Sequence, residues 1–232
     1  MTRQAMFARM VMRSVTRRRS RVLIAVLAVA IGATTLFALA AVAIDIPRQM
    51  SREMRAYGAN LLVLPADGAA SVPADRLPAV AAAVGSDGLI GWAPYRYQTV
   101  RLNAQPYLAA GTDLAAVQAV SPYWHVDGDW PARPGQVLVG ADIADWISLA
   151  PGDRVELTAD DGAVMFDVAG ILATGGSEDT LVLMALADLE ALTGVAGHLD
   201  VVEFSVAADA LTIERLAAGV EAAVPGVVAT PV

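Results

Sequence analysis

The sequence contains no cysteine and no lysine. Without cysteine there are no disulfide bonds and no thiol chemistry, so the core alone must stabilise the fold. Without lysine a P-loop is excluded, since that motif needs one. Only two histidines occur, His125 and His198, and neither lies in a context typical of a catalytic nucleophile and its base. A carboxylate pair stays open, but nothing marks one. We therefore expect no enzymatic activity and no cofactor in this chain.

Charge is missing from residues 22–44, an uninterrupted run of 23 residues. As a helix rising about 1.5 Å per residue, the run would be about 34 Å long, enough to cross the roughly 30 Å of bilayer hydrocarbon. A cleaved signal peptide is the alternative, but the apolar region of a signal peptide is usually only about 7–15 residues long. The run therefore predicts a retained transmembrane helix at residues 22–44.

Acidic residues are absent before Asp45, whereas residues 1–21 carry seven arginines, among them Arg17, Arg18, Arg19 and Arg21. Basic residues beside a membrane helix stay in the cytoplasm. These four should set the topology, with the N-terminus inside and the main domain on the extracytoplasmic (periplasmic) side of the cytoplasmic membrane. Residues 1–21 are either a basic amphipathic helix on the bilayer surface or only a topology signal.

The part of the chain after the uncharged run is strongly acidic. It holds the other 9 arginines and all 24 acidic residues, a net charge of −15. Because nucleic acids attract basic surfaces, nucleic acid is not expected as a partner. The pattern of residues 45–58 predicts a stalk helix that ends at Gly58. Met50, Met54 and Tyr57 would lie on one stripe of this helix.

Hydrophobic periodicity and turn signals predict a mixed α+β fold beyond the stalk. Strands are expected at residues 60–64, 89–103, 107–111, 136–139, 154–158, 164–173, 181–184, 201–206 and 227–229. Helices are expected at residues 73–84, 113–120, 141–146, 187–193 and 211–224, the last with Asp209 as its N-cap. Residues 121–135 are expected to be a loop, and residues 160–162 the turn of a hairpin.

The order of these elements predicts two subdomains outside the membrane. Residues 59–111 and 199–232 would form a split βαβ layer, into which residues 112–198 insert a small β-rich subdomain. Because a final strand at residues 227–229 has barely begun when the sequence stops, we expect the chain to be one half of a larger gene product.

Two short segments are candidate sites. His125, Asp127 and Asp129 alternate along the chain and are weak candidates for a metal site, although a solvated loop is the simpler interpretation. The loop of Gly175, Gly176, Ser177, Glu178 and Asp179 is expected to be flexible and acidic, and to contact a partner. We expect all four tryptophans, Trp92, Trp124, Trp130 and Trp146, to be core residues first, with Trp124 and Trp130 as further partner-contact candidates.

The order of several short motifs resembles the N-terminal half of FtsX-like, MacB-type ABC transporter permeases, from the first transmembrane helix through the extracytoplasmic core domain. The motifs lie at residues 13–21, 31–32, 57–64, 111–113, 123–128, 136–144, 151–153 and 166–172. The sequence departs from the family at Gln136, where an acidic residue is usual.

The resemblance implies partners and a mechanism. ATP would be hydrolysed by a separate ABC ATPase subunit, and a second permease subunit, identical or different, would complete a dimer in the bilayer. ATP-driven motion of the stalk would move the extracytoplasmic domain, which acts on a substrate or a protein partner outside. The resemblance does not identify the substrate or say whether the cell has an outer membrane.

Two other functions remain open at this point. The chain would be a membrane-anchored binding or adaptor module without an ATPase if it lacks further hydrophobic helices. It would be an anchored metal protein or enzyme if the group around His125 holds a metal.

Overall fold

The computed structural model describes residue 24, residues 27–37, residues 58–159 and residues 162–232. The chain divides into two compact units, Met1–Glu53 and Met54–Val232. The expected basic segment, most of the stalk and the turn residues 160–161 lie outside the described residues, and with them Arg17, Arg18, Arg19, Arg21, Met50, Met54 and Tyr57.

The first unit is described only at residue 24 and residues 27–37, which are helical with exposed side chains. The hydroxyls of Thr34 and Thr35 donate hydrogen bonds to the carbonyl oxygens of Ala30 and Ile31, each at 2.8 Å, so both polar groups are satisfied within the helix. Among the described residues, no helix combines the length and the apolar character needed to cross a membrane. The rest of the predicted transmembrane segment, residues 22–44, is outside the described part.

The described part of the second unit is built on ten strands that form one mixed sheet, beside a separate strand pair. The strands of the large sheet are β1 (Leu61–Pro65), β3 (Leu89–Leu102), β4 (Gln105–Thr112), β5 (His125–Gly128), β6 (Gln136–Gly140), β7 (Arg154–Ala159), β8 (Gly162–Ala173), β9 (Leu181–Ala185), β11 (Val201–Val206) and β12 (Val227–Pro231). The separate pair is β2 (Val72–Pro73) with β10 (His198–Leu199).

In the described part of the second unit, five α-helices and two 3-10 turns accompany these strands. They are η1 (Ala74–Arg76), α3 (Leu77–Val84), α4 (Leu114–Val120), α5 (Ala141–Ile147), η2 (Ser177–Thr180), α6 (Leu186–Thr193) and α7 (Ala210–Ala223). Asp209 caps α7 as expected, since its Oδ1 accepts the Thr212 N–H at 2.8 Å.

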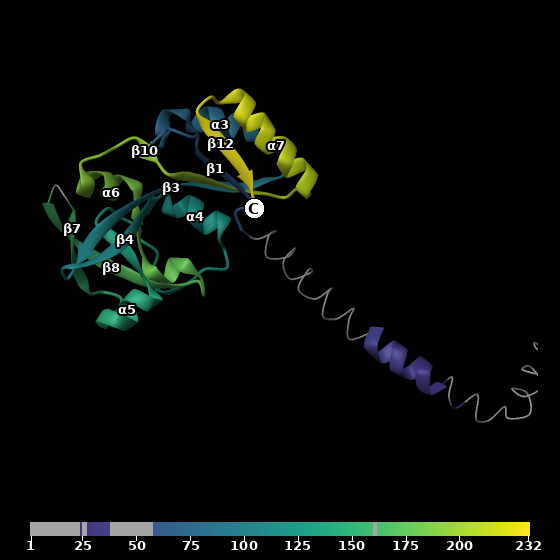
Figure 1. Ribbon diagram of the computed structural model, residues 1–232. Helices are drawn as coiled ribbons and strands as arrows, with labels where there is room; N and C mark the ends of the chain where they lie inside the picture. The colour runs from purple at the N-terminus through teal and green to yellow at the C-terminus, as the bar shows by residue number, and fades with distance from the viewer. Residues whose placement is uncertain (1–23, 25–26, 38–57, 160–161) are drawn as a thin grey trace, which may run out of the picture. The chain divides into compact units, whose positions relative to one another are not determined.

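One end of the sheet is an open layer covered by two helices. The order β12-β1-β11-β3 is antiparallel throughout. Figure 1 shows α3 and α7 together over β12 and β1, and their buried side chains meet Leu61, Val63 and Phe204 in one hydrophobic cluster. This layer combines segments from both ends of the second unit.

The other end closes into a small barrel. The strands β3, β4, β9, β6 and β8 follow one another in the sheet, and β7 pairs with both β8 and β3, which completes a ring of six. Inward side chains such as Val100, Val139, Leu157 and Phe166 fill the ring. Because closure removes strand edges, this part exposes few unpaired backbone groups.

Most predicted helices and strands agree with the described structure, but the short strands β2 and β10 were not expected, and the helix expected from residue 73 begins only at Leu77, after β2 and η1. Residues 125–128, expected in a loop, form β5, which pairs antiparallel with β8. The barrel includes β3 and β4, although the inserted subdomain was expected to begin only at residue 112, and the ten strands form one continuous sheet. The subdomain boundaries expected at residues 111 and 199 stay a prediction.

Candidate binding groove at the end of strands β4 and β9

Strand β3 changes neighbours halfway along its length. Residues 95–102 pair with β4, and of these Tyr95 also pairs with β11 and residues 101–102 also pair with β7. Residues 89–94 pair with β11 on one side and with no strand of the described structure on the other. The pairing with β11 is irregular near Ile90, where the register shifts between Ser205 and Val206. Such bulges occur next to functional sites, where they redirect side chains.

The backbone of this free edge offers few hydrogen-bonding groups. The Tyr95 carbonyl accepts the Asp200 N–H at 2.9 Å, so the main chain of Tyr95 faces the β11 side. Since main-chain groups alternate in direction along a strand, those of Trp92 and Pro94 face the free side. Proline has no N–H, which suits it to an edge. The edge therefore directs the N–H and C=O of half-buried Trp92 to the free side, and with them the C=O of Pro94, which is itself buried.

Two helices begin next to this edge and pack on opposite faces of the sheet. β4 and β9 are adjacent and parallel, with Thr112 opposite Ala185, and they lead directly into α4 and α6. Leu189 of α6 enters the barrel, where a Cβ on Gly111 would lie 2.7 Å from Leu189 Cδ2. On the other face, Val120 of α4 packs at Gly91. A crevice at the carboxyl ends of parallel strands, where the connections diverge, is a common ligand site.

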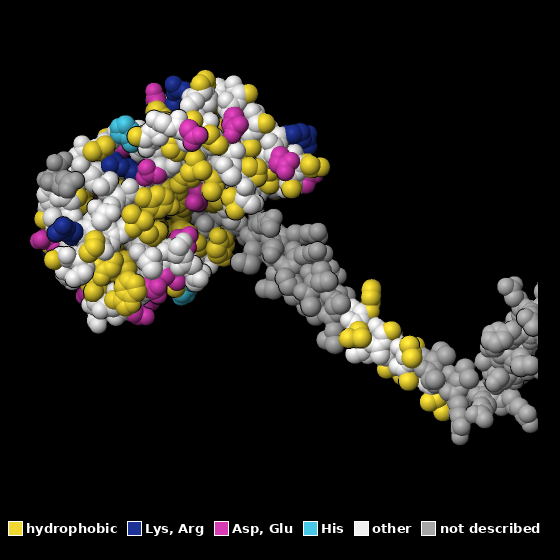
Figure 2. Space-filling view, in the orientation of Figure 1, with side chains coloured by type: hydrophobic (Ala, Val, Ile, Leu, Met, Phe, Trp, Pro, Cys, Tyr) yellow, Lys and Arg dark blue, Asp and Glu magenta, His cyan; other side chains and the backbone are white. Residues whose placement is uncertain are grey.

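A groove of about 750 Å³ occupies this crevice. Its walls are largely apolar, and Ile90 in it is 48% exposed. Figure 2 shows hydrophobic side chains gathered in a hollow near the centre of that face, with acidic side chains beside them. Lining side chains include Leu77, Ile90, Trp92, Ala116, Ala119 and Leu186.

Two carboxylates, Asp113 and Glu190, line the same groove. Asp113 Oδ1 accepts the N–H groups of Ala115 and Ala116 at 3.0 and 3.1 Å and so caps α4. Glu190 Oε1 accepts the Gly197 N–H at 2.7 Å. Each carboxylate is thereby held in place through one oxygen. Both would favour a cation in the groove and disfavour an anion.

A separate cluster of acidic groups lies on the sheet near Tyr95. The Tyr95 and Tyr97 rings stack with centroids 5.9 Å apart. Burial raises the pKa of Glu203 to about 7, and the nearby Glu178 adds to this shift. Burial and the charge of Glu203 also raise the pKa of both tyrosines above the ordinary value. Both tyrosines therefore stay protonated at neutral pH, and Glu203 loses its proton only around pH 7.

The three candidate metal ligands lie at the surface, on β5 and just after it. His125 and Asp127 lie exposed on β5, and Asp129 follows it. No cluster of three or more metal-binding side chains occurs in the parts of the chain that the structure describes. The second histidine, His198, lies on β10, where its Nδ1 is 2.7 Å from Ser71 Oγ.

The acidic loop folds into a hydrogen-bonded turn around Thr174. Asp179 accepts the N–H groups of Thr174 and Gly175 at 2.6 and 2.9 Å. The Thr174 hydroxyl is 3.1 Å from Glu178 Oε2, and Gly176 N–H donates to Thr174 Oγ1 at 3.0 Å. Ser177 begins η2, whose surface stays partly exposed. This segment therefore presents a shaped acidic surface, and its role as a partner contact stays a prediction.

The tryptophans separate into core and surface residues. Trp92 stacks on Phe204 with ring centroids 5.9 Å apart. Trp124 and Trp130 are partly buried and pack against a hydrophobic cluster that includes Leu138 and Leu172. Trp146 was expected in the core, and this is wrong, because it is 66% exposed. Helix α5 buries Ile143 and Ala144 instead, and Trp146 lies on its solvent side.

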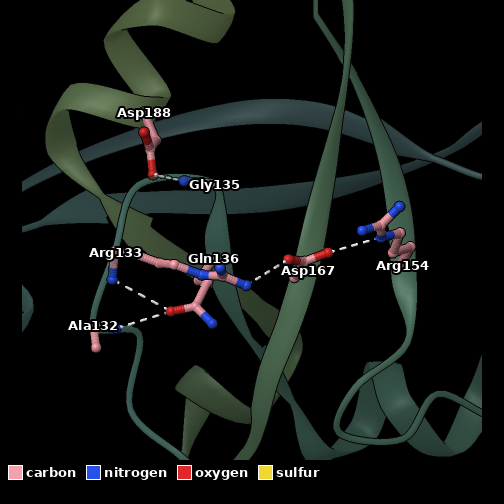
Figure 3. Close-up of polar contacts among 7 residues, drawn as sticks. All are labelled: Ala132, Arg133, Gly135, Gln136, Arg154, Asp167 and Asp188. Carbon is pink, nitrogen blue, oxygen red and sulfur yellow. Dashed lines mark hydrogen bonds and ion pairs between the residues drawn. The ribbon is translucent and has the colours of Figure 1, made fainter.

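A polar network anchors residues 132–136 (Figure 3). Asp167 accepts from Arg133 Nη2 at 3.1 Å and from Arg154 Nε at 2.9 Å. Gln136 Oε1 accepts the N–H groups of Ala132 and Arg133, and Asp188 Oδ2 accepts that of Gly135. Because the Gln136 side chain acts only as an acceptor in these bonds, the acid usual at this position could accept the same two bonds.

Sequence reasoning missed the groove, because its walls come from four separate segments. Two signals were present. Pro94 interrupts a strand-like run, which indicates a strand edge. Ala116 and Ala119 lie three apart on α4, which leaves room beside that helix.

Comparison with known families and structures agrees with this architecture. The profile of the MacB-like periplasmic core domain family matches residues 22–223. The crystal structure of the periplasmic region of MacB from Actinobacillus actinomycetemcomitans is similar with a TM-score of 0.56 at 8% identity, over 77% of this chain and 91% of that one.

The extracellular domain of the ABC-type transporter YknZ from Gram-positive bacteria is similar with a TM-score of 0.50 at 14% identity, over 74% of this chain and 98% of that one. The comparison with curated proteins gives no match. At these identities the two structures show a shared fold.

Proposed function

Since this chain belongs to the family of MacB-like periplasmic core domains, we propose that it couples ATP hydrolysis in the cytoplasm to work on a substrate or partner outside the cell membrane. The family places the described domain as the extracytoplasmic core of an ABC transporter permease. ATP would bind to a separate ATPase subunit, because this chain has no lysine for a P-loop. The chain itself would carry neither a cofactor nor catalytic residues.

The family profile carries this proposal, because its match begins at residue 22, inside the uncharged run, and extends to residue 223. A membrane anchor at residues 22–44 with the N-terminus in the cytoplasm would connect the ATPase to the outer domain. The back-bonded hydroxyls of Thr34 and Thr35 suit such an anchor, since neither needs a hydrogen bond from water. A second permease subunit would complete the transporter.

The test is a pull-down of the full-length gene product, tagged at its cytoplasmic end and solubilised gently from native membranes. We expect a protein with a Walker motif to co-purify, and the complex to hydrolyse ATP. A Walker-lysine variant of that protein is the matched control and should co-purify without ATPase activity. If only extracytoplasmic proteins co-purify, the chain is an anchored adaptor and the coupling mechanism is wrong.

A further inference from the structure

We propose that the groove between α4, α6 and the free edge of β3 binds an extended segment of an extracytoplasmic partner protein, apolar at alternate positions and with a basic residue beside Asp113 and Glu190. The family match does not assign this groove, and the inference does not depend on coupling to an ATPase. It rests on the position of the groove, its backbone edge and its charge.

Position favours a binding site. The groove lies where parallel strands β4 and β9 end and their helices turn to opposite faces, so neither helix fills the crevice. Ile90 is 48% exposed there, and Trp92 and Leu186 are only partly buried. A partner that covers these side chains would remove apolar surface from water.

The backbone edge favours an extended segment over a helix or a small molecule. Half-buried Trp92 offers an N–H and a C=O on the side that no strand of the described structure occupies, and the C=O of buried Pro94 faces the same side. An added strand would satisfy these groups and place alternate side chains on the walls of the groove. A helix satisfies its own backbone groups and would leave those of β3 unpaired.

Charge favours a basic residue in that segment. Asp113 and Glu190 are each fixed through one oxygen, which leaves the second oxygen of each carboxylate for a ligand. Residues 45–232 carry a net charge of −15 in total, so the surrounding field also attracts a basic partner. Because Asp113 follows Thr112, which lies opposite Tyr95, the basic residue would lie at the Pro94 end of the edge.

The test uses the full chain in detergent micelles and a library of capped, fluorescent heptapeptides that alternate valine and threonine. The library carries arginine, glutamine or glutamate at either end, and empty micelles are the blank. We expect an arginine peptide to bind tightest in an anisotropy titration and the Trp92 amide to exchange more slowly with solvent when it is bound. If no peptide binds with a dissociation constant below about 1 mM, the proposal is overturned.

Matched variants locate the binding. Ala119→Trp and Ala187→Trp fill the groove from its two walls at exposed positions, and each should weaken binding at least about tenfold. Ala115→Trp places the same bulk on α4 outside the groove lining and should bind normally. The pair Asp113→Asn and Glu190→Gln keeps both backbone hydrogen bonds and should remove the preference for arginine over glutamate.

Three further results would overturn the proposal. Peptide binding that Ala119→Trp leaves unchanged would place the site elsewhere. Binding without slower exchange at Trp92 would exclude strand addition. Competition by tetraphenylphosphonium, with equal affinity for the arginine and glutamate peptides, would indicate a site for small lipophilic cations instead.

Discussion

At the scale of single residues, Glu203 shows how its position in the sheet changes a carboxyl group. The strand register places it opposite Leu62 of β1 and Ala93 of β3, within an apolar surface. Burial there raises its pKa from an ordinary 4.5 to about 7, and Glu178 contributes to the same shift. The folded protein therefore holds a proton on Glu203 that the unfolded chain has already lost at pH 6.

This difference predicts a loss of stability as the pH rises. The contribution of Glu203 is present below pH 4.5 and is lost as the pH rises to about 7, because the folded state must give up a proton that it binds more tightly. Glu203→Gln keeps the shape and cannot ionise. We expect its free energy of unfolding, relative to that of the original chain, to increase between pH 5 and pH 8 by on the order of 3 kcal/mol.

Urea unfolding of both proteins at pH 5, 6, 7 and 8 measures this effect. Glu214→Gln, at an exposed position of α7, is the matched control and should keep the pH profile of the original chain. If the pH profile of Glu203→Gln runs parallel to that of the original chain across this range, then the folded protein does not hold a proton on Glu203 there.

At the scale of elements, the contact between η2 and the start of α5 depends on one glycine. A Cβ on Gly140 would overlap the carbonyl group of Asp179 and lie 2.7 Å from the Glu178 carbonyl oxygen. These are backbone atoms of a turn fixed by hydrogen bonds to Thr174 and Gly175, so they cannot move alone. We expect Gly140→Ala to lower the free energy of unfolding by about 1–3 kcal/mol.

Gly219→Ala is the matched control for this prediction, since Gly219 lies in α7 and a Cβ added there would have open space around it, with no neighbouring atom within 4 Å. Alanine at this position should stabilise the protein by roughly 0.5–1 kcal/mol, because glycine is a poor helix former. Thermal unfolding of both variants gives the comparison. Equal shifts in the two melting temperatures would mean that η2 does not make this close contact with Gly140 in solution.

Elements were predictable from the sequence where the pattern is local. The apolar spacing along α7 and its cap Asp209, and the alternation along β11, each carry enough information within about ten residues. β5 was missed because it has only four residues, of which three are exposed, and it exists only through its pairing with β8. Trp146 was misplaced because a helix of seven residues buries only one narrow side.

Sites were less predictable than elements, because they depend on pairing between distant strands. The groove needs β4 beside β9, a contact between residues 108–112 and 181–185, and nothing near either strand in sequence indicates it. Likewise the barrel closes through two residue pairs between β3 and β7. The order of the motifs identified the family, because each motif is a local pattern in the sequence. It could not locate the groove, because the groove is formed by four separate segments.

At the scale of the whole molecule, the proposed function depends on motion that passes from the membrane to the outer domain. The sheet and the closed barrel share β3, so the second unit has few places where it could absorb a displacement internally. A pull or tilt applied at its start would then move the unit as a body. The proposed lever is the stalk at residues 45–58, whose predicted stripe of Met50, Met54 and Tyr57 should transmit that force.

A flexible insertion separates this lever from a simple tether. Four glycine and serine residues after Met50 should leave ATP hydrolysis by the partner subunit intact but abolish the work that depends on it, because a flexible linker does not transmit a displacement. The same insertion after Gly68, in an exposed turn between β1 and β2, is the matched control and should keep both activities. ATPase and transport assays on the reconstituted complex measure the two. If transport continues undiminished with the insertion at Met50, then the chain only anchors its domain, and motion through the stalk is not how ATP hydrolysis does work outside.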